Sequence, residues 1–526
     1  MIEVKDKIAA GAVWLGIEFG STRIKACLID ESTAPIAEGS HSWENRLENG
    51  IWTYSEEDIR SGLQSCYADL KRDVHEKYGT VPKKLMGIGI SAMMHGYLAF
   101  DSQDRLLTPF RTWRNTVTAE AAGKLSALFG TNIPQRWSIA HLYQAILNGE
   151  DHVKEVASLN TLAGWVHYQL TGIRELGIGD ASGMFPIKDG NYDQEMLDKF
   201  SALDEVKTSG LDIRKILPKA VKAGKGSAVL TEEGAGLLDP AGDLESGCKA
   251  APPEGDAGTG MTATNSVRIG TGNVSAGTSI FSMMVLDRPL KGCYPQIDVV
   301  TTPDGADVAM VHCNNCCGEL DKWVAMFAEF AKLSGHETDI SKVYELLYTN
   351  AMNGSPDCGG ITSYNYISGE PVTGVEKGSP AYFRSPDSPM RLSDFIRAEL
   401  YGAMAALKAG NDILFGKEGV SPASFTGHGG LFKVRSAAQQ ILADALGSEV
   451  SVMSTAGEGG AWGMALLAAY NAENCEKSLA DWLDDRVFSC MEKTTLKPSA
   501  KGQEGWNEYM ERYKKGLDAQ RLLGEI

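Results

Sequence analysis

One pattern occurs twice in the chain and restricts its fold more than any other feature. Two apolar, β-rich runs flank a short turn of glycine and hydroxyl residues, first at Gly20-Ser21-Thr22 and again at Gly277-Thr278-Ser279. Such runs on both sides of a short polar turn predict a β-hairpin. Glycine lets a ligand approach the backbone closely, and serine or threonine adds a hydroxyl donor. The two hairpins lie about 257 residues apart, which indicates a duplicated architecture.

The segments that follow each hairpin are typical of α/β layers. Ser55 is the predicted N-cap of a helix over 55–78, and a short apolar strand is expected within 84–91. After the second hairpin, the pattern predicts a long helix over 390–416. The other expected elements are a short strand that ends in a glycine turn over 424–430, a helix over 436–447, a strand over 450–453, a helix over 461–470 and amphipathic surface helices in about the last 50 residues. Strands that alternate with helices predict a layered α/β fold.

The domain count follows from the same duplication. A length of 526 residues alone suggests three or four domains, at about 150 residues each. A segment rich in Gly, Ala and Pro, 234–264, precedes the second hairpin, and we place a domain boundary near its end. The sequence therefore predicts two large domains, 1–265 and 266–526.

Composition excludes several classes of function. Lys and Arg total 50 against 68 Asp and Glu, a formal net charge of −18, which opposes nucleic-acid binding. No run approaches the roughly 20 apolar residues that span a bilayer, and the charged N-terminus does not resemble a signal peptide. Most of the cysteines stand singly in apolar segments, which is typical of reduced thiols, so we expect a cytoplasmic protein. The Gly-Lys-Gly-Ser at 224–227 lacks the earlier glycine of a P-loop.

Several short motifs, in their order along the chain, resemble the FGGY carbohydrate kinases of the actin and hexokinase-like ATPase superfamily. Met94-His95-Gly96 is similar to the Met-His-Gly of the xylulokinase-like members, and Gly255-Asp256 resembles the family's Gly-Asp loop. The other similar segments are the two hairpins, 109–115, 179–183, 366–370, Gly429-Gly430 and 458–461. Because the motifs are collinear over nearly the whole chain, the resemblance is far stronger than any one of them.

The resemblance implies an α/β fold of two actin-like, ribonuclease H-like domains with a cleft between them. It places the sugar mainly on the N-terminal domain and ATP on the C-terminal domain. It implies Asp256 as the general base and sugar contact, with further sugar contacts from Met94, His95, Gly96, Trp113 and Asn115. The implied ATP contacts are Gly20, Ser21, Thr22, Lys25, Gly277, Thr278, Ser279, Gly429, Gly430 and Lys433, and the implied Mg²⁺ ligands are Glu18 and Asp256.

Two positions depart from the family pattern. Glu18 stands where the family carries Asp, and a glutamate reaches one methylene further. It either holds Mg²⁺ through water or is a strand carboxylate with little function. Arg114 intervenes between Trp113 and Asn115, where the family has Asn or Asp directly after Trp, so the identity of the sugar stays open.

The expected function is ATP-dependent phosphorylation of a sugar hydroxyl, with a ketopentose such as xylulose first. Ribulose, gluconate, glycerol and erythritol are alternative substrates. A non-catalytic sugar or nucleotide sensor and an actin-like ATPase that acts on protein partners are alternative functions. Retention of Asp256 opposes the sensor, and the lack of a separate peptide-binding domain opposes the ATPase. We expect a small-molecule partner without nucleic acid or membrane, and we leave a homodimer open.

The segment His312-Cys313-Asn314-Asn315-Cys316-Cys317 has two interpretations. Cys-x-x-Cys is a spacing found in zinc sites. No second pair of cysteines or histidines follows at the usual distance, so a buried turn that leads into a helix is favoured.

Overall fold

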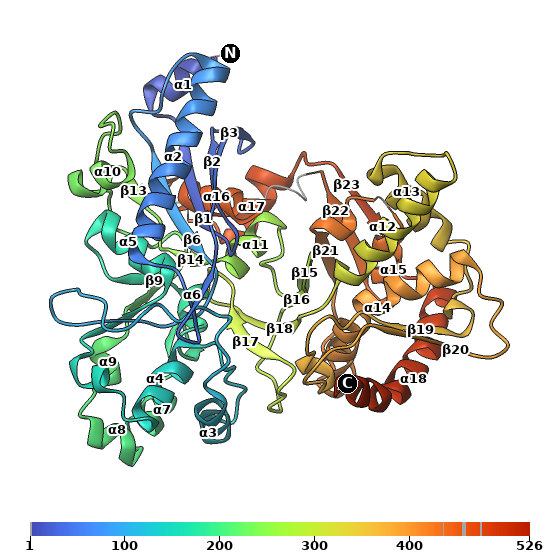
Figure 1. The fold of residues 1–526 in the computed structure, drawn as a ribbon. Helices are drawn as coiled ribbons and strands as arrows, with labels where there is room; N and C mark the ends of the chain where they lie inside the picture. The colour runs from blue at the N-terminus through green and yellow to red at the C-terminus, as the bar shows by residue number, and fades with distance from the viewer. Residues whose placement is uncertain (1–2, 435, 455–458, 474–475, 526) are drawn as a thin grey trace. The chain divides into compact units, whose positions relative to one another are not determined.

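The computed structural model of the chain describes residues 3–434, 436–454, 459–473 and 476–525. The chain divides into two compact units. Unit 1 comprises 1–267, 299–308 and 458–490, and unit 2 comprises 268–298, 309–457 and 491–526. Each unit contains its own β-sheet with helices packed against it (Figure 1).

The sheet of unit 1 has six strands, in the order β13-β6-β1-β2-β3, with β14 also paired to β6. β1 and β2 form the predicted antiparallel hairpin. β6 runs parallel to β1, and β13 and β14 run parallel to β6. The carboxyl ends of β1, β6 and β14 therefore lie at one edge of the sheet. The strands are β1 (Trp14–Phe19), β2 (Arg23–Ile29), β3 (Pro35–Ser42), β6 (Gly87–Ala92), β13 (Lys249–Ala250) and β14 (Glu254–Gly255).

Helices α2 (Glu56–Tyr78) and α16 (Gly459–Glu473) pack on opposite faces of this sheet. A Cβ on Gly39 of β3 would meet the backbone of α2, and a Cβ on Gly16 of β1 would meet the backbone of α16. Gly39 and Ile17 are both paired with Ala26 of β2, so the two residues lie on the same face of the sheet. Neighbouring residues of a strand point to opposite faces, so Gly16 and Gly39 face opposite ways.

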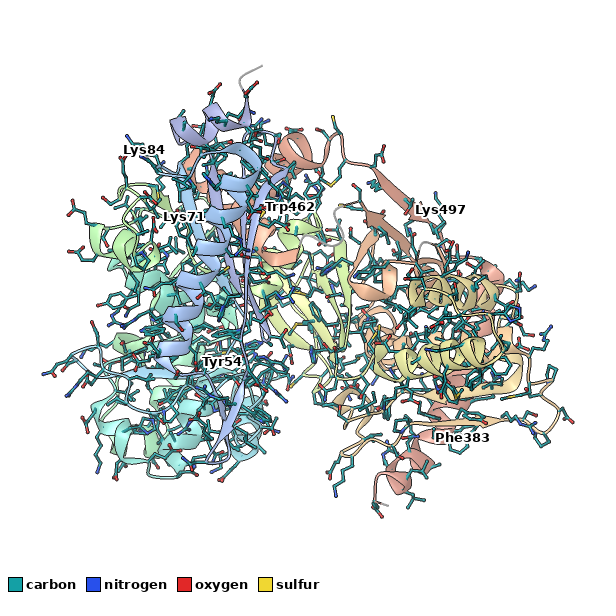
Figure 2. All side chains as sticks on the ribbon, turned by 45° about the horizontal axis from the view of Figure 1, so that its top comes forward. Tyr54, Lys71, Lys84, Phe383, Trp462 and Lys497 are labelled. Atoms are coloured by element: carbon teal, nitrogen blue, oxygen red, sulfur yellow. The ribbon has the colours of Figure 1, made fainter. Side chains whose placement is uncertain are left out.

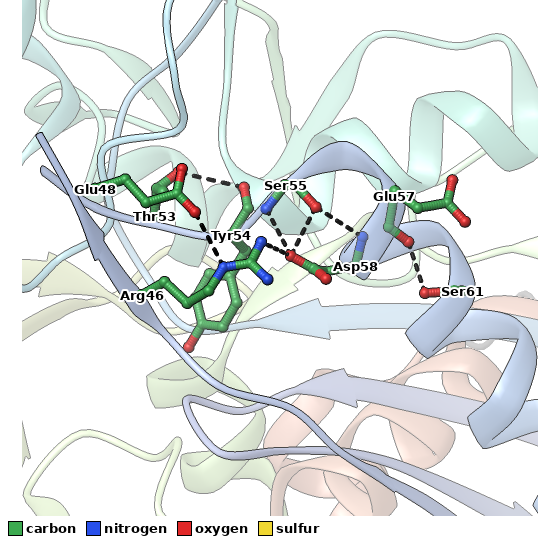
Figure 3. Close-up of polar contacts among 8 residues, drawn as sticks. All are labelled: Arg46, Glu48, Thr53, Tyr54, Ser55, Glu57, Asp58 and Ser61. Carbon is green, nitrogen blue, oxygen red and sulfur yellow. Dashed lines mark hydrogen bonds and ion pairs between the residues drawn. The ribbon is translucent and has the colours of Figure 1, made fainter.

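The start of α2 is confirmed at the residue that the sequence indicates. The Ser55 side chain accepts a hydrogen bond from the Asp58 N–H, and the Asp58 carboxylate accepts one from the Ser55 N–H, which makes a capping box (Figure 3). Arg46, from β4 (Arg46–Glu48), forms an ion pair with the same Asp58 carboxylate. The helix entry angle is thereby tied to the β4 hairpin.

Helix α16 belongs to unit 1, although the division at residue 265 placed it with the second half. The reason is its packing, because almost every side chain from Gly460 to Asn471 is buried against β1, β6 and α11 (Asp256–Ala263). Trp462 of this helix is labelled in Figure 2. Its indole donates a hydrogen bond to the Thr33 carbonyl at 2.8 Å. A single cut near residue 265 therefore does not describe the compact units.

Unit 1 also contains shorter elements, most of which come between the strands of its sheet in the order of the chain. They are α1 (Val4–Ala10), β5 (Ile51–Thr53), β7 (Leu98–Phe100), α3 (Ala119–Phe129), α4 (Ser138–Leu147), β8 (Ser158–Asn160), α5 (Leu162–Thr171), β9 (Glu175–Gly177), α6 (Ile178–Ser182), β10 (Ile187–Lys188), β11 (Asn191–Tyr192), α7 (Gln194–Ser201), α8 (Asp204–Ser209), α9 (Ile213–Ile216), β12 (Lys219–Val221), α10 (Glu232–Leu238) and α17 (Leu479–Leu483).

The second sheet has seven strands, in the order β17-β18-β16-β15-β21-β22-β23. β15 and β16 form the second predicted hairpin, and β15, β21 and β22 run parallel. The strands are β15 (Thr271–Ala276), β16 (Ile280–Val285), β17 (Asp298–Thr301), β18 (Asp307–Cys313), β21 (Ser424–His428), β22 (Glu449–Met453) and β23 (Lys493–Leu496). The other elements are α12 (Cys317–Leu333), α13 (Ile340–Ala351), β19 (Ile361–Tyr364), β20 (Ala381–Arg384), α14 (Leu392–Asp412), α15 (Ala437–Leu446) and α18 (Ala500–Leu523).

The C-terminal segment differs from its expectation as a set of surface helices. β23 pairs with β22 and completes the sheet, and α18 buries Trp506, Tyr509 and Tyr513 completely. The aromatic side chains decide this, because burying such large apolar areas is favourable. Among the described residues, no helix combines the length and the apolar character needed to cross a bilayer.

Candidate active site

Three segments leave the sheet of unit 1 at the edge where β1, β6 and β14 end. They carry the turn at Gly20–Thr22, the segment Met93–Tyr97 and the residue Asp256. In α/β sheets, ligands bind outside the carboxyl ends of the strands. The topology thus brings together three of the motifs that the sequence singles out.

Asp256 is the first residue of α11, directly after β14, rather than a residue of an open loop. One oxygen of its carboxylate accepts a hydrogen bond from the Met94 N–H at 3.1 Å. Its side chain is exposed, whereas Gly255 and Ala257 on either side are buried. Crowding by the surrounding protein raises the pKa of the Asp256 carboxyl, and the charge of Arg136 opposes that rise. An accessible carboxylate with a raised pKa is suited to accept a proton.

The Met94-His95-Gly96 segment has an unusual backbone. His95 and Gly96 both have positive φ, at 70° and 90°. Left-handed geometry at a histidine is sparsely populated and occurs often at functional sites. The His95 Nδ1 lies 3.2 Å from the Gly183 carbonyl oxygen, which can only accept. A neutral ring bound in this way carries its lone pair on Nε2, which suits it to accept from a hydroxyl.

Glu18, at the end of β1, lies beside the N-terminus of α16. The N–H groups of Gly460 and Ala461 donate to its carboxylate, and a Cβ on Gly460 would come within 2.1 Å of its Oε1. Burial, together with the charge of Asp256, raises the pKa of Glu18 to about 7, while Lys25 and the two N–H groups oppose this rise. Lys25 is the residue paired with Glu18 across the hairpin.

The turn Gly20–Thr22 is oriented by two aromatic side chains. The Trp43 indole donates to the Gly20 carbonyl at 2.7 Å, and the Tyr54 hydroxyl donates to the Ser21 carbonyl at 2.6 Å. A peptide group is planar, with its C=O and N–H pointing in opposite directions. Fixing these carbonyls therefore aims the N–H groups of Ser21 and Thr22 away from Trp43 and Tyr54, an arrangement that suits anion binding.

The segment 113–115 divides into three different roles. The Trp113 indole donates to the Ser21 hydroxyl at 3.2 Å, which places it beside the turn. Both amide hydrogens of Asn115 are used by the carbonyls of Trp52 and Thr112, and the residue is buried. Asn115 therefore holds the backbone of β5, and the structure does not favour a direct sugar contact for it. Arg114 is exposed, with its guanidinium 3.7 Å from the centre of the Trp52 ring.

Sequence reasoning missed Glu254 and Arg136, which lie near Asp256, and it noted Asp180 only as part of the segment 179–183. The Glu254 carboxylate accepts from the N–H groups of Gly179, Asp180 and Gly255, so it ties α6 to the strand that precedes Asp256. Burial raises the pKa of both Glu254 and Asp180. Arg136 lies close enough to lower the pKa of Asp256. A glutamate is rarely buried, and the burial of Glu254 depends on N–H donors far along the chain. No local sequence pattern therefore indicates it.

Unit 2 brings the second hairpin next to a glycine turn. A Cβ on Gly429, at φ 101°, would come within 2.4 Å of the Ala276 carbonyl oxygen, at the end of β15. A Cβ on Gly277 or Gly430 would meet no atom within 4 Å, so both backbones are open. Thr278 and Lys433 are exposed, and Ser279 is half-buried. The turn at 458–461 lies partly outside the described residues, since Glu458 is not among them.

The described residues contain no group of three or more His, Cys, Asp or Glu side chains arranged to hold a metal ion. Glu18 and Asp256 are two carboxyl groups whose charges disfavour each other. Mg²⁺ is commonly bound by one or two carboxylates, several waters and substrate phosphates. This pair fits that pattern. Cys313 is buried at the end of β18, and Cys316 and Cys317 begin α12, as expected for a turn that leads into a helix.

Each unit thus has helices packed on a sheet that contains one of the two hairpins, which is the actin-like ATPase fold. Sequence models of the FGGY family of carbohydrate kinases match residues 13–239 as the N-terminal domain and 272–472 as the C-terminal domain. The chain belongs to this family and is an ATP-dependent carbohydrate kinase.

Individual relatives cover nearly the whole chain at low identity. A xylulose kinase of Haemophilus influenzae is 23% identical over an alignment of 528 positions, which covers 95% of this chain and 98% of the relative. The xylulose kinase of Rhodospirillum rubrum has a similar structure, with TM-score 0.77, 16% identity, and 96% and 98% of the two chains covered. The gluconate kinase of Lactobacillus acidophilus is similar to the same extent, with TM-score 0.75, 17% identity, and the same coverage. Relatives this distant do not decide the sugar.

Proposed function

We propose that the protein transfers the γ-phosphoryl group of ATP to a hydroxyl of a ketopentose, with xylulose as the first candidate. The accessible carboxylate of Asp256 carries this proposal, because it is bound to the N–H of Met94, the residue before His95. Ribulose, gluconate, glycerol and erythritol are the alternative substrates. A coupled ADP-release assay over these compounds tests the proposal. ATP binding without turnover on any of them would favour a sensor instead.

Each side chain has a defined part in this reaction. His95 Nε2 accepts a hydrogen bond from a sugar hydroxyl, and Trp113 lies against an apolar C–H face of the sugar. Asp256 takes the proton from the attacking hydroxyl as its oxygen bonds to the γ-phosphorus. Phosphoryl transfer needs positioning and charge stabilisation more than covalent help. The turns at Gly20–Thr22, Gly277–Ser279 and Gly429–Gly430 supply N–H and hydroxyl donors to phosphate oxygens, and Lys25 and Lys433 supply positive charge.

Glu18 and Asp256 would hold Mg²⁺ in this reaction, the ion supplying charge neutralisation at the β- and γ-phosphates. The protein's own N–H groups already hold Glu18 in place, since Gly460 and Ala461 donate to it. Glu18 would then hold the ion through a water molecule rather than directly.

The protein acts in the cytoplasm in this proposal, and it forms a homodimer. Light scattering on the purified protein measures its oligomeric state.

Replacing Glu18 tests the metal assignment. Glu18→Ala should raise the Mg²⁺ concentration for half-maximal activity at least about tenfold. The variant lacks the carboxylate that would hold the ion, so Mg²⁺ beside the phosphates is bound more weakly. Glu18→Asp should change it much less, since a carboxylate is kept. Steady-state rates over a Mg²⁺ titration give both values. An unchanged Mg²⁺ dependence in both variants would remove the metal role.

Arg114 should discriminate between acidic and neutral sugars. Among the described residues, no carboxylate forms an ion pair with its guanidinium, which Trp52 holds in place. Arg114→Gln should lower kcat/KM for gluconate at least about tenfold more than for xylulose, because only the acid forms a charge-assisted hydrogen bond. Arg46→Gln is the matched control, since that arginine already pairs with Asp58. Equal changes for the two sugars would contradict this role.

A further inference from the structure

The pair Cys316 and Cys317 lies directly against the turn of the second hairpin. The Cys316 N–H donates to the Thr278 carbonyl at 3.0 Å, and the Cys317 N–H donates to the Gly277 carbonyl at 3.1 Å. These carbonyls belong to the turn to which we assign phosphate binding. The Cys316 carbonyl in turn accepts from the Asn365 side chain at 2.8 Å. The backbone of the cysteine pair thus holds the shape of the turn.

The two thiols of the pair are close enough to react with each other. Their sulfur atoms lie 3.6 Å apart, and both cysteines are reduced. Cys316 is buried, with 1% of its surface exposed, whereas Cys317 is only half-buried. Contact with Cys317 and burial both raise the pKa of the Cys316 thiol. Cys317 is therefore the thiol that a small oxidant in solution reaches first.

We propose that Cys316 and Cys317 form a thiol-oxidation site whose closure into a disulfide disables the second phosphate-binding turn. A peroxide transfers one oxygen to the Cys317 sulfur, which leaves a sulfenic acid and one water. The Cys316 sulfur then attacks the Cys317 sulfur, an S–S bond forms, and the second water leaves. Two thiols lose two electrons, and one peroxide is reduced to two waters.

Closure of this bond must move the backbone that supports the turn. Neighbouring Cα atoms are about 3.8 Å apart across a trans peptide, below the usual disulfide range of about 4.4–6.8 Å. The sulfur atoms must also approach from 3.6 Å to a bonded distance near 2 Å. The peptide that joins the two cysteines therefore rotates, and its single N–H, that of Cys317, leaves the Gly277 carbonyl. A strained bond of this kind is readily reduced, so the change is reversible by thiols.

The experiment compares oxidised and reduced full-length protein by mass and by nucleotide binding. Hydrogen peroxide should remove two hydrogen atoms from the tryptic peptide 292–322 of a Cys293→Ser, Cys490→Ser variant, which lacks the two cysteines that are exposed among the described residues. Oxidation should weaken ATP binding at least about tenfold by calorimetry, and dithiothreitol should restore it. Cys317→Ser should keep the same ATP affinity before and after oxidation.

Three results would overturn the proposal. The first is a peptide that keeps both hydrogens. The second is a loss of two hydrogens that Cys313→Ala abolishes, since this would indicate a disulfide with Cys313. The third is equal weakening of ATP binding in oxidised Cys317→Ser. The effect on ATP rests on the proposed function of the turn, but the mass measurement does not. A reduced protein that binds no ATP would therefore count against the nucleotide site alone.

Discussion

Replacing Asp256 by asparagine should lower kcat by at least about 10³-fold, the upper part of the range for loss of a general base. The amide cannot take the proton of the attacking hydroxyl. Its oxygen can still accept the hydrogen bond from the Met94 N–H, so the variant should fold normally. Rates from the coupled ADP-release assay and the melting temperature measure the two effects separately.

Asp204→Asn is the matched control for this substitution. Asp204 is also the exposed first residue of a helix in unit 1, α8, but it belongs to none of the family motifs. This variant should keep the activity of the unmodified protein. Near-normal kcat in Asp256→Asn would show that another group takes the proton. Crowding raises the pKa of Asp256. The rate should therefore fall with decreasing pH in a range above the ordinary pKa of an aspartate in water, as the base becomes protonated.

Replacing Gly463 by alanine should lower the free energy of unfolding by about 2–3 kcal/mol, as expected for overpacking in a rigid core. A Cβ at this position of α16 would lie 2.1 Å from the Thr259 carbonyl oxygen and 2.9 Å from its carbonyl carbon. Both atoms are backbone of α11, so no side chain can rotate away. Alanine also favours a helix by up to about 1 kcal/mol over glycine, which the clash must exceed.

The Gly463→Ala variant should lose activity as well as stability, because α11 begins with Asp256. Gly123→Ala in α3 is the matched control, since a Cβ there would meet no atom within 4 Å. It should stabilise the protein by about 0.5–1 kcal/mol. Thermal unfolding of the two variants side by side measures the difference. A melting temperature of Gly463→Ala at or above that of the unmodified protein would contradict this account of the packing.

Local patterns predicted much of the framework of each unit. Both hairpins and helix α2 are confirmed, because a polar turn between apolar runs and a capping box are set by residues close in sequence. The family and its enzyme class were also within reach, because the motifs occur in a fixed order. The roles of Asn115 and Glu254 were not, because each depends on hydrogen bonds to partners far along the chain.

The sequence by itself determined that this chain has two hairpins with turns of glycine and hydroxyl residues and a Gly-Asp motif before the second one. The tertiary structure decided that α16 joins the first unit, where it supplies N–H donors to Glu18 and packs on the helix of Asp256. It also decided that the two adjacent cysteines support the second turn. The reason is that a sequence pattern records the period of burial along an element. It does not record which distant surface covers that element.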